Sequence, residues 1–244
     1  MKHFWINIDK NEERRSFMTD QYKKMKLEHY RVPAITPNDF DELLVQKRPL
    51  TCKHPGCNTC EYEFACLCSH IKAIQEGLKS NDEYFVIMED DIVIPSSINY
   101  EEMLKNVPDD MEILQLLILY GNTVVNLAKF YMHTKQICIK WQYLFPSTGM
   151  YIISRTGAQK LVELFYDKNE NKYDFGKSPY QIVADVLLYQ SVNTYATTIP
   201  YAYPNSEMGS EIHPDHLSAQ QDAILHIKHV LNTMQNIPFT KAIN

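Results

Sequence analysis

Glu89, Asp90 and Asp91 stand together directly after the apolar run YFVIM at residues 84–88. Large apolar side chains at every position predict a strand that is buried on both faces of a sheet. Carboxylates at the end of such a strand repel one another, so either their pKa values rise or a cation balances them. Mg²⁺ and Mn²⁺ commonly take one or two carboxylates together with substrate phosphates. Because Glu89 and Asp91 point to the same side of an extended chain, we expect them to share a metal ion; the alternative is a solvated, acid-rich turn.

Asp185 is the single charged residue between Ile182 and Leu188, in a segment that reads as a buried helix. A lone buried carboxylate is costly unless it is paired or in use. Burial raises the pKa of a carboxyl group, which suits a general base. The alternative, a carboxyl group that only hydrogen-bonds to a neighbouring element, fits the sequence equally well.

Ser69 and His70 lie in the segment EYEFACLCSHIKAIQEG, residues 61–77, at the expected start of a helix. Free N–H groups at a helix start can hold an anion, whereas a Ser-His pair is more often used for capping and packing. The sequence contains no G-x-S-x-G hydrolase motif. It also contains neither G-x-x-x-x-G-K-[ST] nor G-x-G-x-x-G, the usual nucleotide-binding motifs.

Five of the six cysteines lie between Cys52 and Cys68. In a reducing compartment such clustering favours metal binding or buried thiols over disulfides. Cys66 and Cys68 are expected to be buried thiols on opposite sides of the helix start. A structural Zn²⁺ ion takes four Cys or His ligands, and the residues that could supply them are Cys52, His54, Cys57 and Cys60.

The 244 residues are 45% hydrophobic and carry a formal net charge of -6, with a pI of about 5.8. This balance shows no electrostatic footprint of a nucleic-acid-binding protein. No window approaches the ~20 apolar residues of a membrane span. The first residues do not match a secretory signal. We therefore expect a cytoplasmic protein, located in the host cytoplasm if the source is viral.

Strand-like and helix-like patterns alternate along the chain, which predicts an α/β fold with a mostly parallel sheet covered on both faces. The simplest organisation is one domain over residues 1–244, with a Cys-rich insertion at about 45–62. In such sheets, ligands bind beyond the carboxyl ends of the strands. The expected strands are 3–8, 29–35, one that ends at the acidic triplet, 111–119, 137–141 and 150–154. The expected helices follow Asp9, cover Ile71 to Leu78, and span about 156–166, 178–189 and 216–235.

Several separated stretches resemble family 25 glycosyltransferases, the lipopolysaccharide and collagen galactosyltransferase type. The stretch INIDKNEERR resembles the opening block of that family, EFACLCSH resembles its Glu-x-Gly-Cys-x-x-Ser-His block, and VIMEDDIVI resembles its Leu-Glu-Asp-Asp-Val stretch. RVPAITP, STGMYIISRTGAQKL, Asp185 and GSEIH follow in the family's order between about residues 4 and 213. The chain departs from the family where Ala65 replaces a glycine and Glu211 an aspartate, and residues 45–62 match no block of it.

This resemblance implies a GT-A (Rossmann-like) fold and the inverting transfer of a hexose, galactose or glucose, from a UDP-sugar to a hydroxyl group on a glycan or protein. It implies a Mn²⁺ or Mg²⁺ ion at Glu89 and Asp91. His213 is the candidate for a further ligand, with Glu211 and His216 as rivals. Asp185 would be the catalytic base. The residues expected to bind the nucleotide sugar are Asn7, Asp9, Arg14, Ala34, Ser69, His70 and Asp90, although Arg14 could instead only fasten the first helix.

Two other functions fit the same residues. A metal-dependent phosphotransferase or hydrolase would use the same acids on phosphoester substrates. A non-catalytic relative would bind sugar nucleotides or proteins without transfer. Uptake of UDP with Mn²⁺, and its retention when Asp185 is replaced, would separate these functions.

Overall fold

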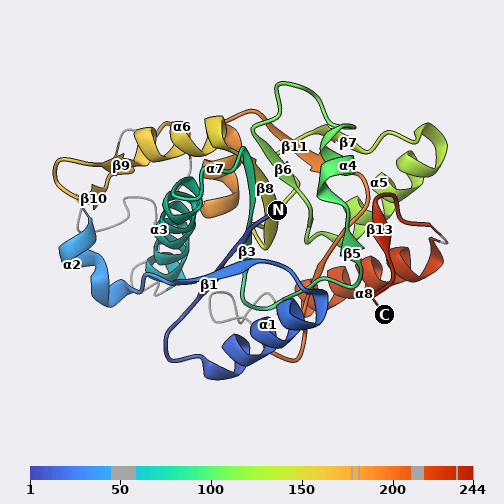
Figure 1. Ribbon diagram of the computed structural model, residues 1–244, viewed down its shortest axis with the longest axis horizontal. Coiled ribbons are helices and arrows are strands. Elements are labelled where there is room, and N and C mark those ends of the chain that lie inside the picture. The colour runs from blue at the N-terminus through green and yellow to red at the C-terminus, as the bar shows by residue number, and fades with distance from the viewer. Residues whose placement is uncertain (45–58, 177, 181, 210–216, 235, 244) are drawn as a thin grey trace.

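The computed structural model describes residues 1–44, 59–176, 178–180, 182–209, 217–234 and 236–243, without the side chains of Thr59, Cys60 and Leu217. Within these ranges, seven strands form one sheet in the order β2-β1-β3-β8-β6-β11-β7 (Figure 1). They are β1 (His3–Asn7), β2 (His29–Pro33), β3 (Tyr84–Glu89), β6 (Ile113–Gln115), β7 (Cys138–Lys140), β8 (Met150–Ser154) and β11 (Thr194–Thr197).

Most strands of this sheet run in one direction. β1 is parallel to both β2 and β3, and β6 is parallel to β11. β8 lies between β3 and β6 and is antiparallel to both, and β7 is antiparallel to β11 at the edge of the sheet. The predicted α/β class with a mixed, mostly parallel sheet is therefore confirmed. Three short antiparallel pairs lie outside this sheet: β4 (Ile92–Val93) with β12 (Tyr203–Pro204), β5 (Ser97–Ile98) with β13 (Thr240–Lys241), and β9 (Tyr166–Asp167) with β10 (Lys172–Tyr173).

Helices cover both faces of the sheet (Figure 1). Along each central strand, alternate side chains join two separate hydrophobic clusters, as the two-residue period of a strand requires. Phe85 and Ile87 of β3 belong to the cluster under α3, α6 and α7, whereas Val86 and Met88 belong to the cluster under α1, α4, α5 and α8. The helices are α1 (Glu12–Met25), α2 (Phe40–Leu43), α3 (Thr59–Leu78), α4 (Tyr100–Leu104), α5 (Gly121–Thr134), α6 (Arg155–Phe165), α7 (Ala184–Ser191) and α8 (Leu217–Thr233), with the 3-10 turn η1 (Pro37–Asp39) before α2.

Several element boundaries differ from those predicted. The first helix is capped by Asn11, whose side chain accepts a hydrogen bond from the N–H of Arg14, and not by Asp9. The helix predicted from residue 178 begins at Ala184, after a turn that includes Pro179. The strand predicted over 111–119 pairs only over Ile113–Gln115, although the residues after it stay buried.

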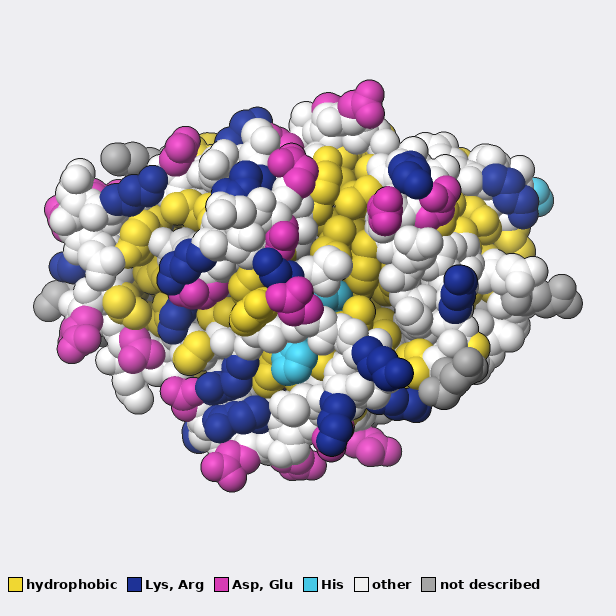
Figure 2. Space-filling model, in the orientation of Figure 1, with side chains coloured by type: hydrophobic (Ala, Val, Ile, Leu, Met, Phe, Trp, Pro, Cys, Tyr) yellow, Lys and Arg dark blue, Asp and Glu magenta, His cyan; other side chains and the backbone are white. Residues whose placement is uncertain are grey.

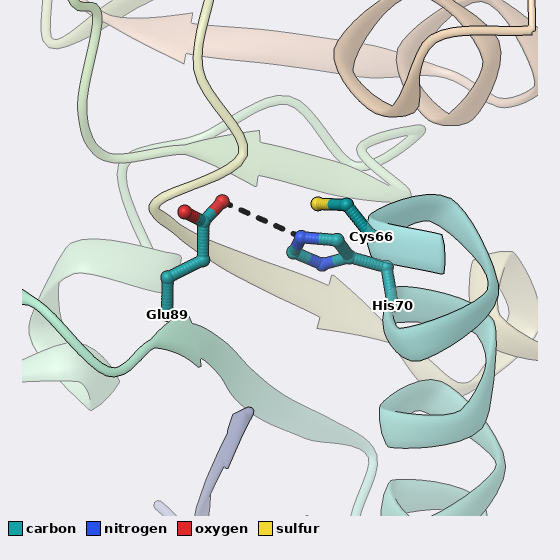
Figure 3. A group of neighbouring side chains, drawn as sticks. All are labelled: Cys66, His70 and Glu89. Carbon is teal, nitrogen blue, oxygen red and sulfur yellow. Dashed lines mark ion pairs between the residues drawn. The ribbon is translucent and has the colours of Figure 1, made fainter. Parts of the chain in front are cut away.

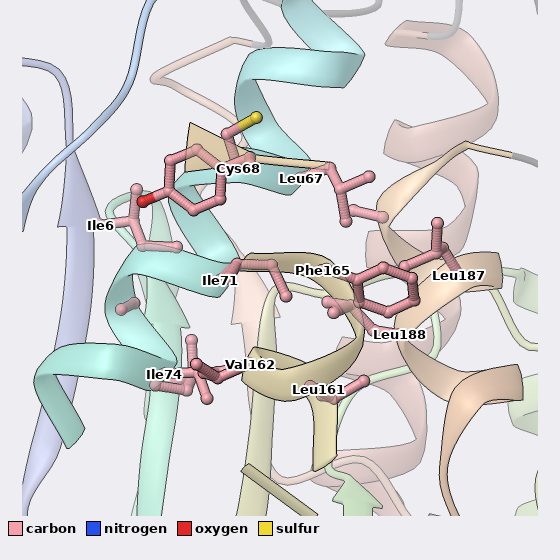
Figure 4. Packing of buried hydrophobic residues seen from close by; sticks show 14 of the residues in the cluster. Ile6, Leu67, Cys68, Ile71, Ile74, Leu161, Val162, Phe165, Leu187 and Leu188 are labelled. Carbon is pink, nitrogen blue, oxygen red and sulfur yellow. The ribbon is translucent and has the colours of Figure 1, made fainter. Parts of the chain in front are cut away.

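α3 is the longest of the described helices (Figure 1), and one of its faces is apolar and packs in the core. Figure 4 shows this face against α6 and α7: Leu67, Cys68, Ile71 and Ile74 lie opposite Leu161, Val162, Phe165, Leu187 and Leu188. At Gly77 the helix comes so close to the sheet that a Cβ atom there would lie 2.1 Å from Cε2 of Phe85. This close approach joins the last turn of α3 to the start of β3.

The surface is mixed in charge. On the face seen in Figure 2, basic and acidic side chains are interspersed, with hydrophobic atoms between them. Among the described helices, none combines the length and the apolar character that crossing a membrane requires.

Gly77→Ala should lower the free energy of unfolding by roughly 1–3 kcal/mol, the usual cost of overpacking a core. This overpacking cost should exceed the gain in helix propensity, which is about 1 kcal/mol for alanine relative to glycine. Urea unfolding followed by circular dichroism measures the loss. Phe85→Leu shortens the facing side chain, so a double-mutant cycle should find the alanine less costly in that background. A variant as stable as the parent would show that α3 does not lie this close to the sheet.

Candidate functional site

A pocket of about 590 Å³ opens at the carboxyl ends of β1, β2 and β3. These strands are parallel, so their ends meet at one edge of the sheet, where ligands bind in α/β folds. The structure brings together nine of the residues predicted from the sequence, which all line this pocket: Asn7, Asp9, Arg14, Ala34, Ser69, His70, Glu89, Asp90 and Asp91.

The acidic triplet spans the end of a strand and a turn. Glu89 is the last residue of β3, and Asp90 and Asp91 form the turn into β4. The prediction that Glu89 and Asp91 alternate along one extended chain is therefore wrong, because the extended chain stops at Glu89. Each carboxylate instead meets its own set of partners.

Asp90 is held by two elements near the N-terminus. Asn7 Nδ2 donates to Asp90 Oδ2 at 2.6 Å, and Arg14 Nη1 donates to Asp90 Oδ1 at 2.7 Å. Burial raises the pKa of Asp90, and the Arg14 charge and the two hydrogen bonds oppose that rise. Both oxygens of Asp90 are thus engaged within the protein.

Asp91 is held much less firmly. Its Oδ1 atom is buried and accepts no hydrogen bond from the described residues, and its Oδ2 atom lies 3.7 Å from Arg14 Nη1. Burial, followed by the neighbouring charge of Glu89, raises the pKa of Asp91 to about 7, although Arg14 opposes the rise. A buried acceptor without a partner costs about 1–3 kcal/mol or more. A bound cation would satisfy this oxygen.

Glu89 faces α3 and the segment before β8. Thr148 Oγ1 donates to Glu89 Oε1 at 2.8 Å, and His70 Nε2 lies 3.4 Å from the same oxygen (Figure 3). Burial acts to raise the pKa of Glu89, but the interactions with His70, Thr148 and Arg14 outweigh it and leave the pKa lowered. The carboxylate is therefore ionised within the pocket.

Ser69 and His70 lie in the middle of α3, since the helix starts at Thr59. The prediction that they stand at a helix start, with free N–H groups for an anion, is wrong. The Ser69 hydroxyl accepts from Ile35 N at 2.8 Å and donates to Ala65 O at 2.7 Å, which ties α3 to the segment after β2.

Asn7 ends β1, Asp9 lies shortly after it, and Ala34 follows β2, so all three line the pocket as expected. Asn7 is buried and its Oδ1 atom accepts from Arg31 Nε at 2.8 Å. Asp9 is exposed and pairs with Arg31, and this hydrogen bond lowers the pKa of Asp9. Ala34 N donates to Asn7 O at 2.9 Å, so the two strand ends are joined directly.

Arg14 joins three segments. Besides Asp90 and Asp91, its guanidinium donates to the backbone oxygens of Met208 at 3.2 Å and Gly209 at 2.8 Å. The sequence left open whether Arg14 fastens the first helix or faces a phosphate. Its contacts fasten α1 to the acidic turn while its side chain lines the pocket.

Asp185 lies in the first turn of α7, beside the pocket but not among the residues that line it. Its carboxyl oxygens accept from Ser147 N at 3.3 Å and Val186 N at 2.9 Å. Burial raises the pKa of Asp185, and these backbone donors oppose the rise. Because Thr148 is adjacent to Ser147, one short segment contacts both Asp185 and Glu89.

Some predicted ligands lie outside the described residues: His213 with its rivals Glu211 and His216, and Cys52, His54 and Cys57 of the proposed zinc site, together with the side chain of Cys60. Cys66 and Cys68 are free thiols, but α3 begins at Thr59, so neither stands at a helix start as predicted, and only Cys68 is fully buried. Cys66 is half-buried and lines the pocket, whereas Cys68 is buried in the core (Figure 4).

Two polar residues that bind predicted site residues were not themselves predicted. Arg31 binds Asn7 and Asp9, and its one signal in the sequence is that it is the arginine within the predicted strand 29–35. Thr148 binds Glu89, and its position within the STGMYIISRTGAQKL block is the one hint of it.

The pKa of Asp91 makes stability depend on pH. Between about pH 4, near the ordinary carboxyl pKa, and about pH 7, the folded chain keeps a proton that the unfolded chain loses, so stability falls as the pH rises. The side chain of Asp91→Asn does not titrate, so the variant does not lose stability in this way. Relative to the parent, it should gain up to roughly 3 kcal/mol between about pH 5 and pH 8, at 1.36 kcal/mol per pKa unit. Urea unfolding of both proteins at the two pH values measures this gain. The prediction is contradicted if the free energies of unfolding of variant and parent differ by the same amount at both pH values.

The sequence model of glycosyltransferase family 25 (LPS biosynthesis protein) matches residues 1–176. A Haemophilus influenzae protein that is named as a candidate glycosyltransferase is 24% identical over 196 residues, which are 77% of this chain and 62% of that protein. The chain thus spans less than two thirds of the length of this relative.

Among solved structures, the chain is similar to the crystal structure of a glycosyltransferase involved in the glycosylation of the major capsid of PBCV-1. The TM-score is 0.31 and the identity 9%, over 65% of this chain and 61% of that chain. Since the family model covers residues 1–176 of the 244, and the same segment carries the acidic triplet and the pocket residues around it, the chain belongs to glycosyltransferase family 25.

Proposed function

We propose that this protein transfers a hexose, galactose or glucose, from a UDP-sugar to a hydroxyl group of a glycan or protein acceptor, with a divalent cation and with inversion at the anomeric carbon. The observation that supports this most directly is the buried, unpartnered Oδ1 atom of Asp91 among the described residues that line a pocket at the strand ends. Membership of a glycosyltransferase family supports sugar transfer in general.

The acidic turn fits a hard cation. Asp91 offers an oxygen without a protein donor in the described part of the chain, and Glu89 offers a second, ionised carboxylate next to it. Mn²⁺ and Mg²⁺ prefer such oxygen ligands and leave coordination positions for phosphate. When bound, a cation here would supply positive charge that stabilises the departing diphosphate. Both oxygens of Asp90 accept hydrogen bonds from the protein. Asp90 would therefore position the turn, and Glu89 and Asp91 would bind the cation.

The other pocket residues have roles that follow from their positions. Arg14 lines the pocket with its positive charge beside Asp90 and Asp91, where it can face a phosphate group. Asn7, Asp9 and Ala34 form the wall at the ends of β1 and β2, which in this proposal borders the nucleoside. A cavity of about 590 Å³ lies within the usual 300–1,000 Å³ range of small-molecule sites.

Asp185 is the proposed base. In an inverting transfer, the acceptor hydroxyl attacks the anomeric carbon from the side opposite the diphosphate, and a base removes its proton. Burial raises the pKa of Asp185, which strengthens it as a base near neutral pH. The N–H groups of Ser147 and Val186 orient the carboxylate.

Asp91→Asn should abolish Mn²⁺-dependent UDP binding, because the amide removes the unpartnered charged oxygen. Changes to groups that merely support metal ligands cost about 10–100-fold in affinity, so the loss here should be at least tenfold. Isothermal titration of UDP with and without Mn²⁺ measures it. Asp20→Asn, on the exposed side of α1, is the matched control and should bind as the parent does. Undiminished binding by Asp91→Asn would exclude the proposed cation site.

Asp185→Asn should lower kcat for transfer by roughly 10²–10⁴-fold, the usual contribution of a general base. It should leave Mn²⁺-dependent UDP binding intact, because Asp185 does not line the pocket. Release of UDP measures the rate across UDP-galactose, UDP-glucose and their N-acetylated forms. A parent protein inactive with every donor would favour a non-catalytic binder, and a preference for phosphoesters would favour a phosphotransferase or hydrolase.

A further inference from the structure

A second group of potential metal ligands lies in the pocket, on the α3 side of Glu89. Cys66 and His70 are one helical turn apart on α3, so their side chains lie on the same face of the helix. Figure 3 shows both pointing toward Glu89 at the end of β3. One ligand atom from each residue, a sulfur, a nitrogen and an oxygen, lies within 4.8 Å of the other two.

The environment of His70 also indicates that a ligand binds here. Its side chain is fully buried, yet Nε2 makes no hydrogen bond within the described part of the chain. The Glu89 oxygen at 3.4 Å lies within ion-pair distance but beyond a good N–H···O hydrogen bond. A buried polar atom without a partner is uncommon and calls for an explanation.

The other ring nitrogen of His70 has a hydrogen-bond partner of its own. Nδ1 lies 3.2 Å from the hydroxyl of Tyr151, which can accept a hydrogen bond from Nδ1–H. When Nδ1 carries the proton, Nε2 has a lone pair, and a metal ion bound there would replace the Nε2 contact with Glu89. Histidines that bind metals almost always donate their other ring N–H to such a partner, which orients the ring.

We propose that Cys66, His70 and Glu89 form a site for a thiophilic divalent metal ion, Zn²⁺ by preference. A thiolate and an imidazole suit Zn²⁺, whereas Mn²⁺ and Mg²⁺ favour oxygen ligands. Three protein ligands leave a fourth position of a tetrahedral ion open to the pocket. Cys66 binds as a thiolate, so its proton is released when the metal binds.

The geometry needs one small adjustment. Zn–S and Zn–N bonds of about 2.3 and 2.0 Å place the ligand atoms of a tetrahedral ion roughly 3.3–3.8 Å apart. His70 Nε2 and Glu89 Oε1, 3.4 Å apart, already have this spacing, so the adjustment concerns the Cys66 sulfur, which lies within 4.8 Å of its partners. Cys66 is half-buried and can turn toward His70. Glu89 is steadied by Thr148 and His70 by Tyr151, so two of the three ligands are already oriented.

This site differs from the proposed cation site at Asp91 in its chemistry, since sulfur and nitrogen replace an all-oxygen set. Glu89 lies between the two and can serve either. The proposal does not rest on the proposed function, because the ligand geometry stands whether or not the chain binds UDP.

Cobalt(II) titration of the full chain tests the proposal, because a thiolate bound to Co²⁺ gives a charge-transfer absorption that oxygen and nitrogen ligands do not give. Cys52, Cys57 and Cys60 are replaced by serine so that the residues of the other proposed zinc site cannot contribute. One equivalent of Co²⁺ should produce the band, and Zn²⁺ should displace it. Cys66→Ser should abolish the band, and Cys68→Ser, two positions along the same helix, should retain it.

Tyr151→Phe tests the positioning of His70. It removes the hydrogen-bond partner of Nδ1 and keeps the ring in the core, so Co²⁺ affinity should fall by about 10–100-fold. A merely structural Tyr151 would change the unfolding free energy and leave this affinity as it was. Circular dichroism of each variant establishes that it is folded.

A second measurement needs no substitution. Zn²⁺ should protect Cys66 of the parent protein from alkylation by iodoacetamide, as mapped by peptide mass spectrometry, while Mn²⁺ should not. A band that survives Cys66→Ser, no band at all, or alkylation of Cys66 that Zn²⁺ does not slow would each overturn the proposal. Asp91→Asn should keep the cobalt band, so the loss of UDP binding and the loss of this site are distinguishable.

Discussion

Three carboxylates lie at the end of one buried strand and in the turn after it, and the fold must balance their charge where they are partly removed from water. Arg14 and Asn7 engage Asp90, and Thr148 and His70 contact Glu89. Within the described residues, an oxygen of Asp91 is left without a hydrogen bond. A buried polar atom without a hydrogen bond destabilises the fold, and proteins usually keep one where a bound ligand supplies the missing interaction.

The sheet topology explains how partners from distant parts of the chain reach this place. β1, β2 and β3 are parallel, so Asn7, Pro33 and Glu89 end at the same edge. β8 is antiparallel to β3, so it begins where β3 ends and brings Thr148 and Tyr151 to that edge. The antiparallel strand is therefore as important to the site as the parallel ones.

Two chemically different environments adjoin each other in the pocket. Around Asp91 the available ligand atoms are oxygens, which suits a hard cation and a phosphate. Around Cys66 and His70 they are sulfur and nitrogen, which suits a softer ion. Only the side chain of Glu89 lies between them. A metal ion bound in one environment therefore changes the electrostatic potential in the other.

The sequence by itself determined the α/β class, most of the strands and the location of the acidic site, because hydrophobic periodicity and charge at a strand end are local patterns. It also predicted nine of the pocket-lining residues, Glu89 and Asp91 from the acidic pattern itself and the others with the help of a resemblance to a family, even though the starts of α1, α3 and α7 were misplaced. Only the tertiary structure decided that Asp90 is engaged by Arg14, that Asp91 is left unpartnered, and that Cys66 and His70 face Glu89. Such contacts join residues that are far apart in the chain, and they depend on how closely α3 and β8 pack against β3, which no local pattern encodes.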